Sequence, residues 1–94
     1  MEEKEVTINN KYGLHSRPAS ALVKKASNFD SEIKLIYDGK EANTKSILGL
    51  MVLAIEPGAE VKIIAEGEDE KEALEELEEL IENDFFVEYD DEDN

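Results

Sequence analysis

The chain of 94 residues lacks several features that define common classes of protein. It contains no cysteine, no tryptophan and no long apolar run, and it has only two prolines. Without cysteine there is neither a disulfide framework nor a thiolate metal site, and without about 18 consecutive apolar residues there is no transmembrane helix. The first residues, Met1–Glu5, have no apolar segment, so we expect no signal peptide. We therefore expect a cytoplasmic protein that does not insert into a membrane.

Basic residues are scarce in the last third of the chain. Residues 1–65 carry nine acidic and nine basic residues, whereas residues 66–94 carry sixteen acidic residues and the single base Lys71, so the whole net charge of −15 arises after residue 65. Nucleic-acid binding requires a basic face, so we expect no nucleic-acid partner. A polyacidic module that binds cations is one alternative, but its carboxylates would be spread over a helix face and a tail without a fixed ligand cage. We expect neither a metal site nor a cofactor.

Histidine and arginine occur once each, and both lie in the stretch Gly13-Leu14-His15-Ser16-Arg17-Pro18-Ala19. Proline is tolerated in the first turn of a helix. Apolar residues follow with helical spacing, at Ala19, Leu22, Val23 and Ala26. The pattern predicts a helix from Ser16 to about Ser27, with His15 just outside its N-terminus.

His15 and Arg17 together suit a labile anion. The first N–H groups of a helix lack intrahelical acceptors and the helix dipole is positive there, so phosphate binds well. A guanidinium also matches phosphate oxygens, and neutral imidazole is a nucleophile near pH 7. We interpret His15 as a reversible phosphoryl carrier, Arg17 as the charge clamp, and the backbone N–H groups of Ser16 and Arg17 as anion ligands. A surface loop histidine is the plainer alternative for His15.

The whole pattern predicts an α+β domain with the element order β-α-β-β-α-β-α. Asp38-Gly39 is typical of a two-residue hairpin, Ser46 is a good helix N-cap, and Asp69 with Glu72 suggests an acidic capping box. Four short strands in one sheet, with helices on one face, give two layers. The expected strands are residues 5–9, 32–37, 40–43 and 60–66, and the helices after the first are residues 47–53 and 69–83.

Two of these segments carry a resemblance to a known family. The stretch of residues 13–19 resembles the active-site motif of the HPr family, the histidine-containing phosphocarriers of the bacterial phosphotransferase system. Lys45-Ser46-Ile47-Leu48-Gly49 resembles that family's second motif, and the similarity runs from about Val6 to about Ile81. It implies an open-faced two-layer sandwich, in which a four-stranded antiparallel sheet has three helices on one face.

The resemblance also divides the chain. We expect an HPr-like phosphocarrier domain over residues 1–84 and an acidic C-terminal tail over residues 85–94. The last residues, Asp90–Asn94, are expected to be disordered, because an acidic run cannot bury itself. Four apolar or aromatic residues are less typical of a tail and could pack back on the domain, namely Phe85, Phe86, Val87 and Tyr89.

The function that the resemblance implies is phosphoryl transfer for sugar uptake. His15 would accept a phosphoryl group on Nδ1 from phospho-enzyme I, fed by phosphoenolpyruvate, and pass it to enzyme II A domains. A partner-docking patch beside it is implied at Ile47, Leu48 and Met51, with a basic rim of Lys24, Lys25 and Lys45. In many Gram-positive relatives an ATP-dependent enzyme, HPr kinase/phosphorylase, phosphorylates the serine that matches Ser46, which would put about two negative charges beside the patch. A plain helix N-cap is the alternative for Ser46.

A second hypothesis keeps the fold but gives the chain another role. It would be a regulatory protein that binds a transcription factor or enzyme, without a part in transport. Relatives specialised in this way tend to lose the histidine, so His15 argues against it. Ser16 and Ala54 depart from the family pattern, which commonly has alanine and glycine at those places. We expect a monomer that is a component of a phosphotransferase system rather than a stand-alone enzyme.

Overall fold

Seven elements follow one another in the order that the sequence pattern predicts, in a computed structural model that describes residues 1–83 and 85. They are β1 (Glu2–Ile8), α1 (Ser16–Ala26), β2 (Glu32–Tyr37), β3 (Lys40–Asn43), α2 (Ile47–Val52), β4 (Ala59–Glu66) and α3 (Glu70–Glu82). Within these residues no helix combines the length and the apolarity needed to cross a bilayer.

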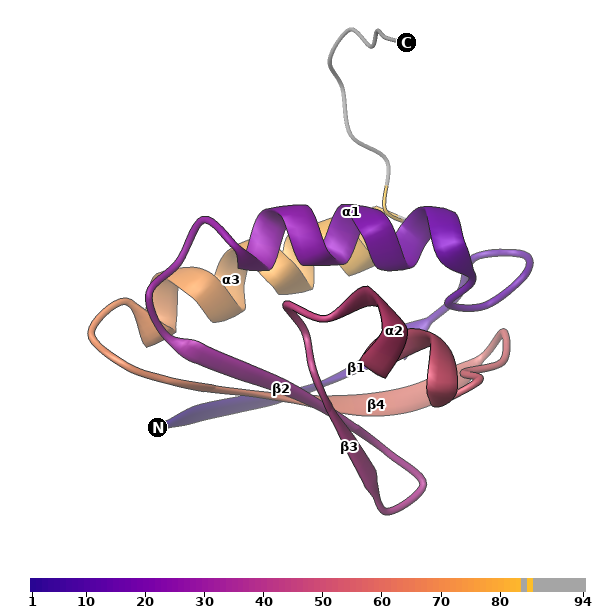
Figure 1. Cartoon of the computed structure of the whole chain (residues 1–94), viewed down its shortest axis with the longest axis horizontal. Helices are drawn as coiled ribbons and strands as arrows, with labels where there is room; N and C mark the ends of the chain where they lie inside the picture. The colour runs from indigo at the N-terminus through magenta and orange to yellow at the C-terminus, as the bar shows by residue number, and fades with distance from the viewer. Residues whose placement is uncertain (84, 86–94) are drawn as a thin grey trace, which may run out of the picture.

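The four strands form one sheet in the order β1-β4-β2-β3. Each neighbouring pair is antiparallel. The strands at the two ends of this order, β1 and β3, are the edges of the sheet. Figure 1 shows all three helices on the same side of the sheet, with α2 below the N-terminal half of α1. The open-faced two-layer sandwich is therefore confirmed.

The core lies between the sheet and the helices. Side chains alternate along each strand, so Val6 and Ile8 of β1, like Ile33 and Leu35 of β2, face the helices and are buried. The helices complete this layer with apolar stripes three and four residues apart, comprising Ala19, Leu22, Ala26, Ala73, Leu74, Leu77, Leu80 and Ile81.

The first strand is longer than the sequence predicted. It begins at Glu2 instead of residue 5, because Glu2 and Lys4 pair in register with Ala65 and Ile63 of β4. The charged residues at its start conceal this pairing in the sequence. The predicted hairpin is present, since Asp38 and Gly39 both have positive φ, of 55° and 78°, as a type I′ turn requires.

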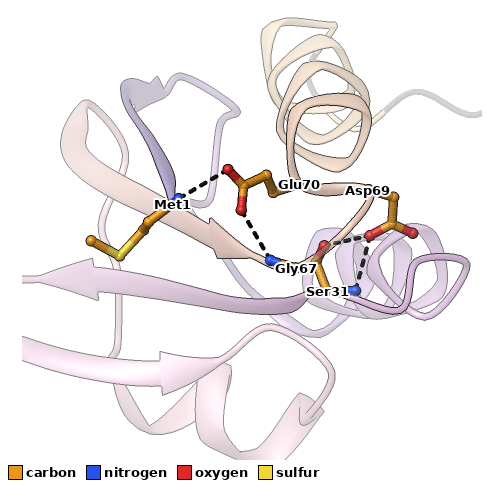
Figure 2. Close-up of polar contacts among 5 residues, drawn as sticks. All are labelled: Met1, Ser31, Gly67, Asp69 and Glu70. Atoms are coloured by element: carbon orange, nitrogen blue, oxygen red, sulfur yellow. Dashed lines mark hydrogen bonds and ion pairs between the residues drawn. The ribbon is translucent and has the colours of Figure 1, made fainter.

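The predicted capping box at Asp69 is wrong. The Asp69 side chain does not cap α3. Its carboxylate accepts hydrogen bonds from the N–H of Asp30 at 2.9 Å and the N–H of Ser31 at 3.0 Å, and also from the Ser31 hydroxyl. Figure 2 shows Asp69 turned toward Ser31, away from its own helix. The carboxylate thus joins the loop before β2 to the turn before α3, where Gly67 lies so close to Ser31 that a Cβ would collide with it.

Glu70, the first residue of α3, makes the contacts with the turn before its own helix. Its carboxylate accepts a hydrogen bond from the Gly67 N–H at 3.0 Å and pairs with the Met1 ammonium at 2.9 Å (Figure 2). These contacts lower the pKa of Glu70, chiefly through the Gly67 N–H, and raise the pKa of the Met1 amino group. The start of β1 is therefore held against the turn before α3.

Phe85, which the sequence division assigned to the tail, is 7% exposed and packs in the core. Its N–H donates to the Leu80 carbonyl at 2.8 Å, just beyond the end of α3. The expected packing of Phe86, Val87 and Tyr89 and the expected disorder of Asp90–Asn94 lie outside the described residues. The division after residue 84 therefore stays an expectation.

Candidate functional site

A tight turn leads the chain into α1. The N–H of Gly13 donates to the Asn10 carbonyl at 3.0 Å, and the Asn10 side-chain amide donates to the Gly13 carbonyl at 2.6 Å. The next N–H, of Leu14, donates to the Ile55 carbonyl at 3.0 Å. Gly13 has a φ of +73°, and a Cβ there would collide with the Ile55 carbonyl oxygen. The turn is thus joined to the loop after α2, where Ala54 has the left-handed φ of 52° that suits the glycine common at this place.

His15 is the N-cap residue of α1. Its backbone is extended, and its carbonyl accepts the first helical hydrogen bond from the Ala19 N–H at 2.9 Å. Its half-buried side chain makes no capping hydrogen bond. Because α1 begins at Ser16, the N–H groups of Ser16 and Arg17 have no carbonyl one turn earlier in the helix, and Pro18 has no N–H. Within residues 1–83 and 85, two amides without an acceptor therefore follow the imidazole directly.

The electrostatics at this end of α1 favour an anion. There is no acidic residue in the first turn, and the basic residues of the last turn lie at the far end. The Arg17 side chain is exposed and forms no ion pair within residues 1–83 and 85. A negative group beside His15 would thus meet the positive end of the helix dipole and a guanidinium.

One neighbour of His15 was not predicted from the sequence. The rings of Tyr12 and His15 lie with their centroids 5.8 Å apart and their planes at 84°, an edge-to-face arrangement. The Lys11 ammonium also lies 5.6 Å from the centroid of the Tyr12 ring. The sequence signal was an aromatic residue three positions before the histidine, but only the turn at Gly13 brings the two rings together.

The short helix α2 presents apolar side chains to solvent. Ser46 caps it, since its hydroxyl oxygen accepts the Gly49 N–H at 3.1 Å. Leu50 is buried beneath the helix. Four residues are exposed, namely Ile47 at 40%, Leu48 at 75%, Met51 at 38% and Val52 at 77%. Val52 was left out of the predicted patch, although its spacing of four from Leu48 places both on one face of the helix.

The three lysines of the predicted rim lie at or near the C-terminal end of α1. Lys24 and Lys25 are nine and ten residues beyond His15, which places them about 14 Å along the axis of α1. Lys25 pairs with Glu76 of α3 at 3.5 Å. The Lys45 ammonium donates to the Phe29 carbonyl at 2.7 Å, beyond the C-terminal end of α1. His15 and Arg17 lie at the opposite end of α1, and α2 lies below that half of the helix (Figure 1).

A match to a family model identifies the family of this chain. The family described as "PTS HPr component phosphorylation site" matches residues 2–83, which include both His15 and Ser46. The chain belongs to the HPr family. The described residues of this HPr-family protein hold no cluster of three or more potential metal-ligating side chains arranged around a metal position.

Individual relatives agree with the family. The HPr-like protein Crh of Bacillus subtilis is 51% identical over 77 residues, which cover 82% of this chain and 91% of Crh. The crystal structure of HPr-C-His from Thermoanaerobacter tengcongensis is 47% identical with a TM-score of 0.89, covering 95% of this chain and all of that one. A crystal structure of Bacillus subtilis Crh described as a swapped, intertwined dimer is 45% identical with a TM-score of 0.72, covering 93% of this chain and all of that one.

Proposed function

We propose that this HPr-family protein carries phosphoryl groups in the phosphoenolpyruvate-dependent sugar phosphotransferase system of the cytoplasm. His15 accepts the group from phospho-enzyme I and passes it to enzyme II A domains. The observation that supports this most directly is the position of His15 at the start of α1, before two free amides and beside Arg17, with no acid in the first turn. These groups stabilise the negative charge that arrives with the phosphoryl group.

In the proposed transfer, the unprotonated ring nitrogen of His15 attacks phosphorus while the bond from phosphorus to the donor breaks. The N–H groups of Ser16 and Arg17 and the Arg17 guanidinium bind phosphoryl oxygens as the charge moves. The nitrogen–phosphorus bond then breaks when the enzyme II A domain attacks, which restores the imidazole. This cycle needs no metal or cofactor held by the chain itself.

The proposed docking surface is the exposed face of α2. Ile47, Leu48 and Met51 form it, and the exposure of Val52 adds that residue. Exposed apolar patches of this kind mark protein interfaces. Lys24, Lys25 and Lys45 stay candidates for its basic edge, although Lys25 and Lys45 also make contacts within the chain.

Regulation through Ser46 is a further part of the proposal. The Ser46 hydroxyl already accepts the Gly49 N–H at the start of α2, and its exposed neighbours are Ile47 and Leu48. A phosphate on this oxygen, added by HPr kinase/phosphorylase, would place negative charge next to the apolar docking surface. We expect the phosphomimetic change Ser46→Asp to weaken binding to enzyme I, as measured by calorimetry, while Ser46→Ala leaves that binding unchanged.

The regulatory role is the second candidate, and the similarity to Crh, described as the catabolite repression HPr of Bacillus subtilis, favours it. In that case the kinase would modify Ser46, but enzyme I would not modify His15. We also propose that the working form is a monomer. Because one Crh structure is a swapped dimer, size-exclusion chromatography with light scattering at several concentrations should decide between the two forms.

The direct test is incubation with enzyme I, phosphoenolpyruvate and Mg²⁺, followed by phosphorus NMR. We expect one acid-labile phosphohistidine signal, which is absent from His15→Ala and is discharged by adding an enzyme II A domain. Arg17→Gln should slow the transfer by about 10- to 100-fold, because it removes one charged hydrogen-bond donor, worth about 1.5–3 kcal/mol, from the transition state. If the unaltered chain shows no acid-labile phosphate, the carrier proposal fails and the regulatory one gains.

A further inference from the structure

We propose that Tyr12 is a positioning residue for phosphoryl transfer, whose ring holds the imidazole of His15 in one orientation. The inference rests on the proposed carrier role of His15. It adds to that role a residue that lies outside the start of α1 and outside the apolar face of α2. The observation that supports it is the edge-to-face contact between the two rings, with centroids 5.8 Å apart.

The contact has the geometry of an attractive aromatic pair. Such pairs favour centroid separations of about 4.5–7 Å and perpendicular planes, because the positive edge of one ring meets the negative face of the other. Within residues 1–83 and 85, the His15 side chain has no hydrogen bond and no ion pair, so Tyr12 is its one specific partner there. The ring of Tyr12 therefore has a direct influence on which rotamer the imidazole adopts.

Tyr12 can serve as a support because its own backbone is held. It occupies the third position of the turn that the Gly13 N–H closes onto the Asn10 carbonyl. The next hydrogen bond, from the Leu14 N–H to the Ile55 carbonyl, joins the turn to the loop after α2. The backbone of Tyr12 is thus positioned by contacts on both sides of it in the chain.

Lys11 also contacts the side chain of Tyr12. Its ammonium lies 5.6 Å from the Tyr12 ring centroid, within range of a cation–π interaction. Tyr12 is 68% exposed, so these two ring contacts, rather than burial, restrain its ring. Lys11 therefore limits the freedom of the Tyr12 ring, which in turn limits the freedom of the imidazole.

Restraint of the imidazole matters because transfer requires a nitrogen lone pair aligned with the phosphorus. A ring that samples several rotamers spends only part of its time in the reactive one, which lowers the rate at saturation. Since the ring pair is a modest interaction, its loss should slow single-turnover transfer from saturating phospho-enzyme I by about 2- to 10-fold. The hydroxyl plays no part, so phenylalanine should substitute for tyrosine.

The experiment compares Tyr12→Phe and Tyr12→Leu with the unaltered chain. Leucine keeps an apolar side chain at the exposed site but removes the aromatic ring. Proton NMR of the unphosphorylated proteins should show one dominant His15 rotamer and a ring-current shift in the unaltered chain and in Tyr12→Phe, with both reduced in Tyr12→Leu. Rapid-quench measurements should show the slower rate at saturation for Tyr12→Leu alone, with little change in the concentration of enzyme I that gives half the maximal rate.

Three outcomes would overturn the inference. The His15 rotamer could be the same in all three proteins, the effect of leucine could lie wholly in the half-saturating concentration, or phenylalanine could fail to restore the rate. The first of these needs no enzyme I, so it is independent of the proposed function. If the unaltered chain and Tyr12→Phe both fail to accept phosphate, the carrier role itself is wrong, whatever the NMR shows.

Discussion

Replacing Gly13 with alanine tests how the turn before α1 is built. Gly13 has a φ of +73°, and a Cβ on it would collide with the Ile55 carbonyl oxygen and approach two backbone atoms of Glu56 at 3.0 and 3.1 Å. Backbone atoms cannot rotate out of the way as a flexible side chain can. The turn must therefore move away from the loop after α2, and the hydrogen bond from the Leu14 N–H to Ile55 must lengthen or break.

The matched control is Gly39→Ala in the hairpin between β2 and β3. Gly39 has nearly the same φ, +78°, but a Cβ there would meet nothing within 4 Å. Both changes incur the left-handed cost of about 1–2 kcal/mol for a residue with a side chain, and both restrict the unfolded chain equally. Gly13→Ala alone also loses a hydrogen bond of about 0.5–1.5 kcal/mol. We expect Gly13→Ala to lower the free energy of unfolding by about 1 kcal/mol more than Gly39→Ala.

Urea denaturation followed by circular dichroism measures this difference directly. In thermal unfolding it should appear as a Tm about 4–8 °C lower for Gly13→Ala than for Gly39→Ala. Gly13→Ala should also slow phosphoryl transfer, since the turn positions both Tyr12 and His15, while Gly39→Ala should not. Equal losses of stability in the two variants would refute the idea that close approach to Ile55, rather than backbone conformation, makes glycine necessary.

Three other predictions concern the helix ends and the surface. Ser46→Ala should lower the free energy of unfolding by about 0.5–2 kcal/mol in urea, because α2 loses its N-cap, whereas an unchanged midpoint would contradict that cap. Leu48→Ala should change stability by less than about 0.5 kcal/mol yet weaken calorimetric binding to enzyme I, while Leu50→Ala should cost about 2–5 kcal/mol because its side chain is buried. The Ser31 hydroxyl, and then a backbone N–H, lower the pKa of Asp69 below 3.8. The contribution of Asp69 to the free energy of unfolding is therefore present above pH 3.8 and is lost as the pH falls through the folded pKa. Asp69→Asn should therefore lose less stability in acid than the unaltered chain, as measured by urea denaturation at a series of pH values.

Much of the fold could be predicted because its signals are local. The strands at residues 32–37 and 40–43 have the predicted bounds, since Asp38-Gly39 favours a hairpin whatever surrounds it. The start of α1 follows from Pro18 and the apolar spacing after it. The cap at Ser46 likewise depends on a residue only three positions away.

The candidate site could be predicted only in part, for the same reason. The place of His15 before a helix follows from its neighbours in the chain. By contrast, the contact with Tyr12 depends on the turn at Gly13, and a hydrogen bond from Leu14 joins this turn to Ile55, forty-one positions later in the chain. The hydrogen bond from the Lys45 ammonium to the Phe29 carbonyl also joins separate loops, so it does not follow from neighbours in the chain.

By itself, the sequence determined which elements form, their order, and that the single histidine stands at a helix start beside the single arginine. Hydrophobic spacing, turn residues and caps act within a few residues, so they can be read without the rest of the chain. The tertiary structure decided that Asp69 bonds Ser31 instead of its own helix, that β1 extends to Glu2, and that Tyr12 meets His15. The first two depend on the sheet order, which brings distant segments together, and the third depends on the turn at Gly13, which a hydrogen bond joins to the loop after α2.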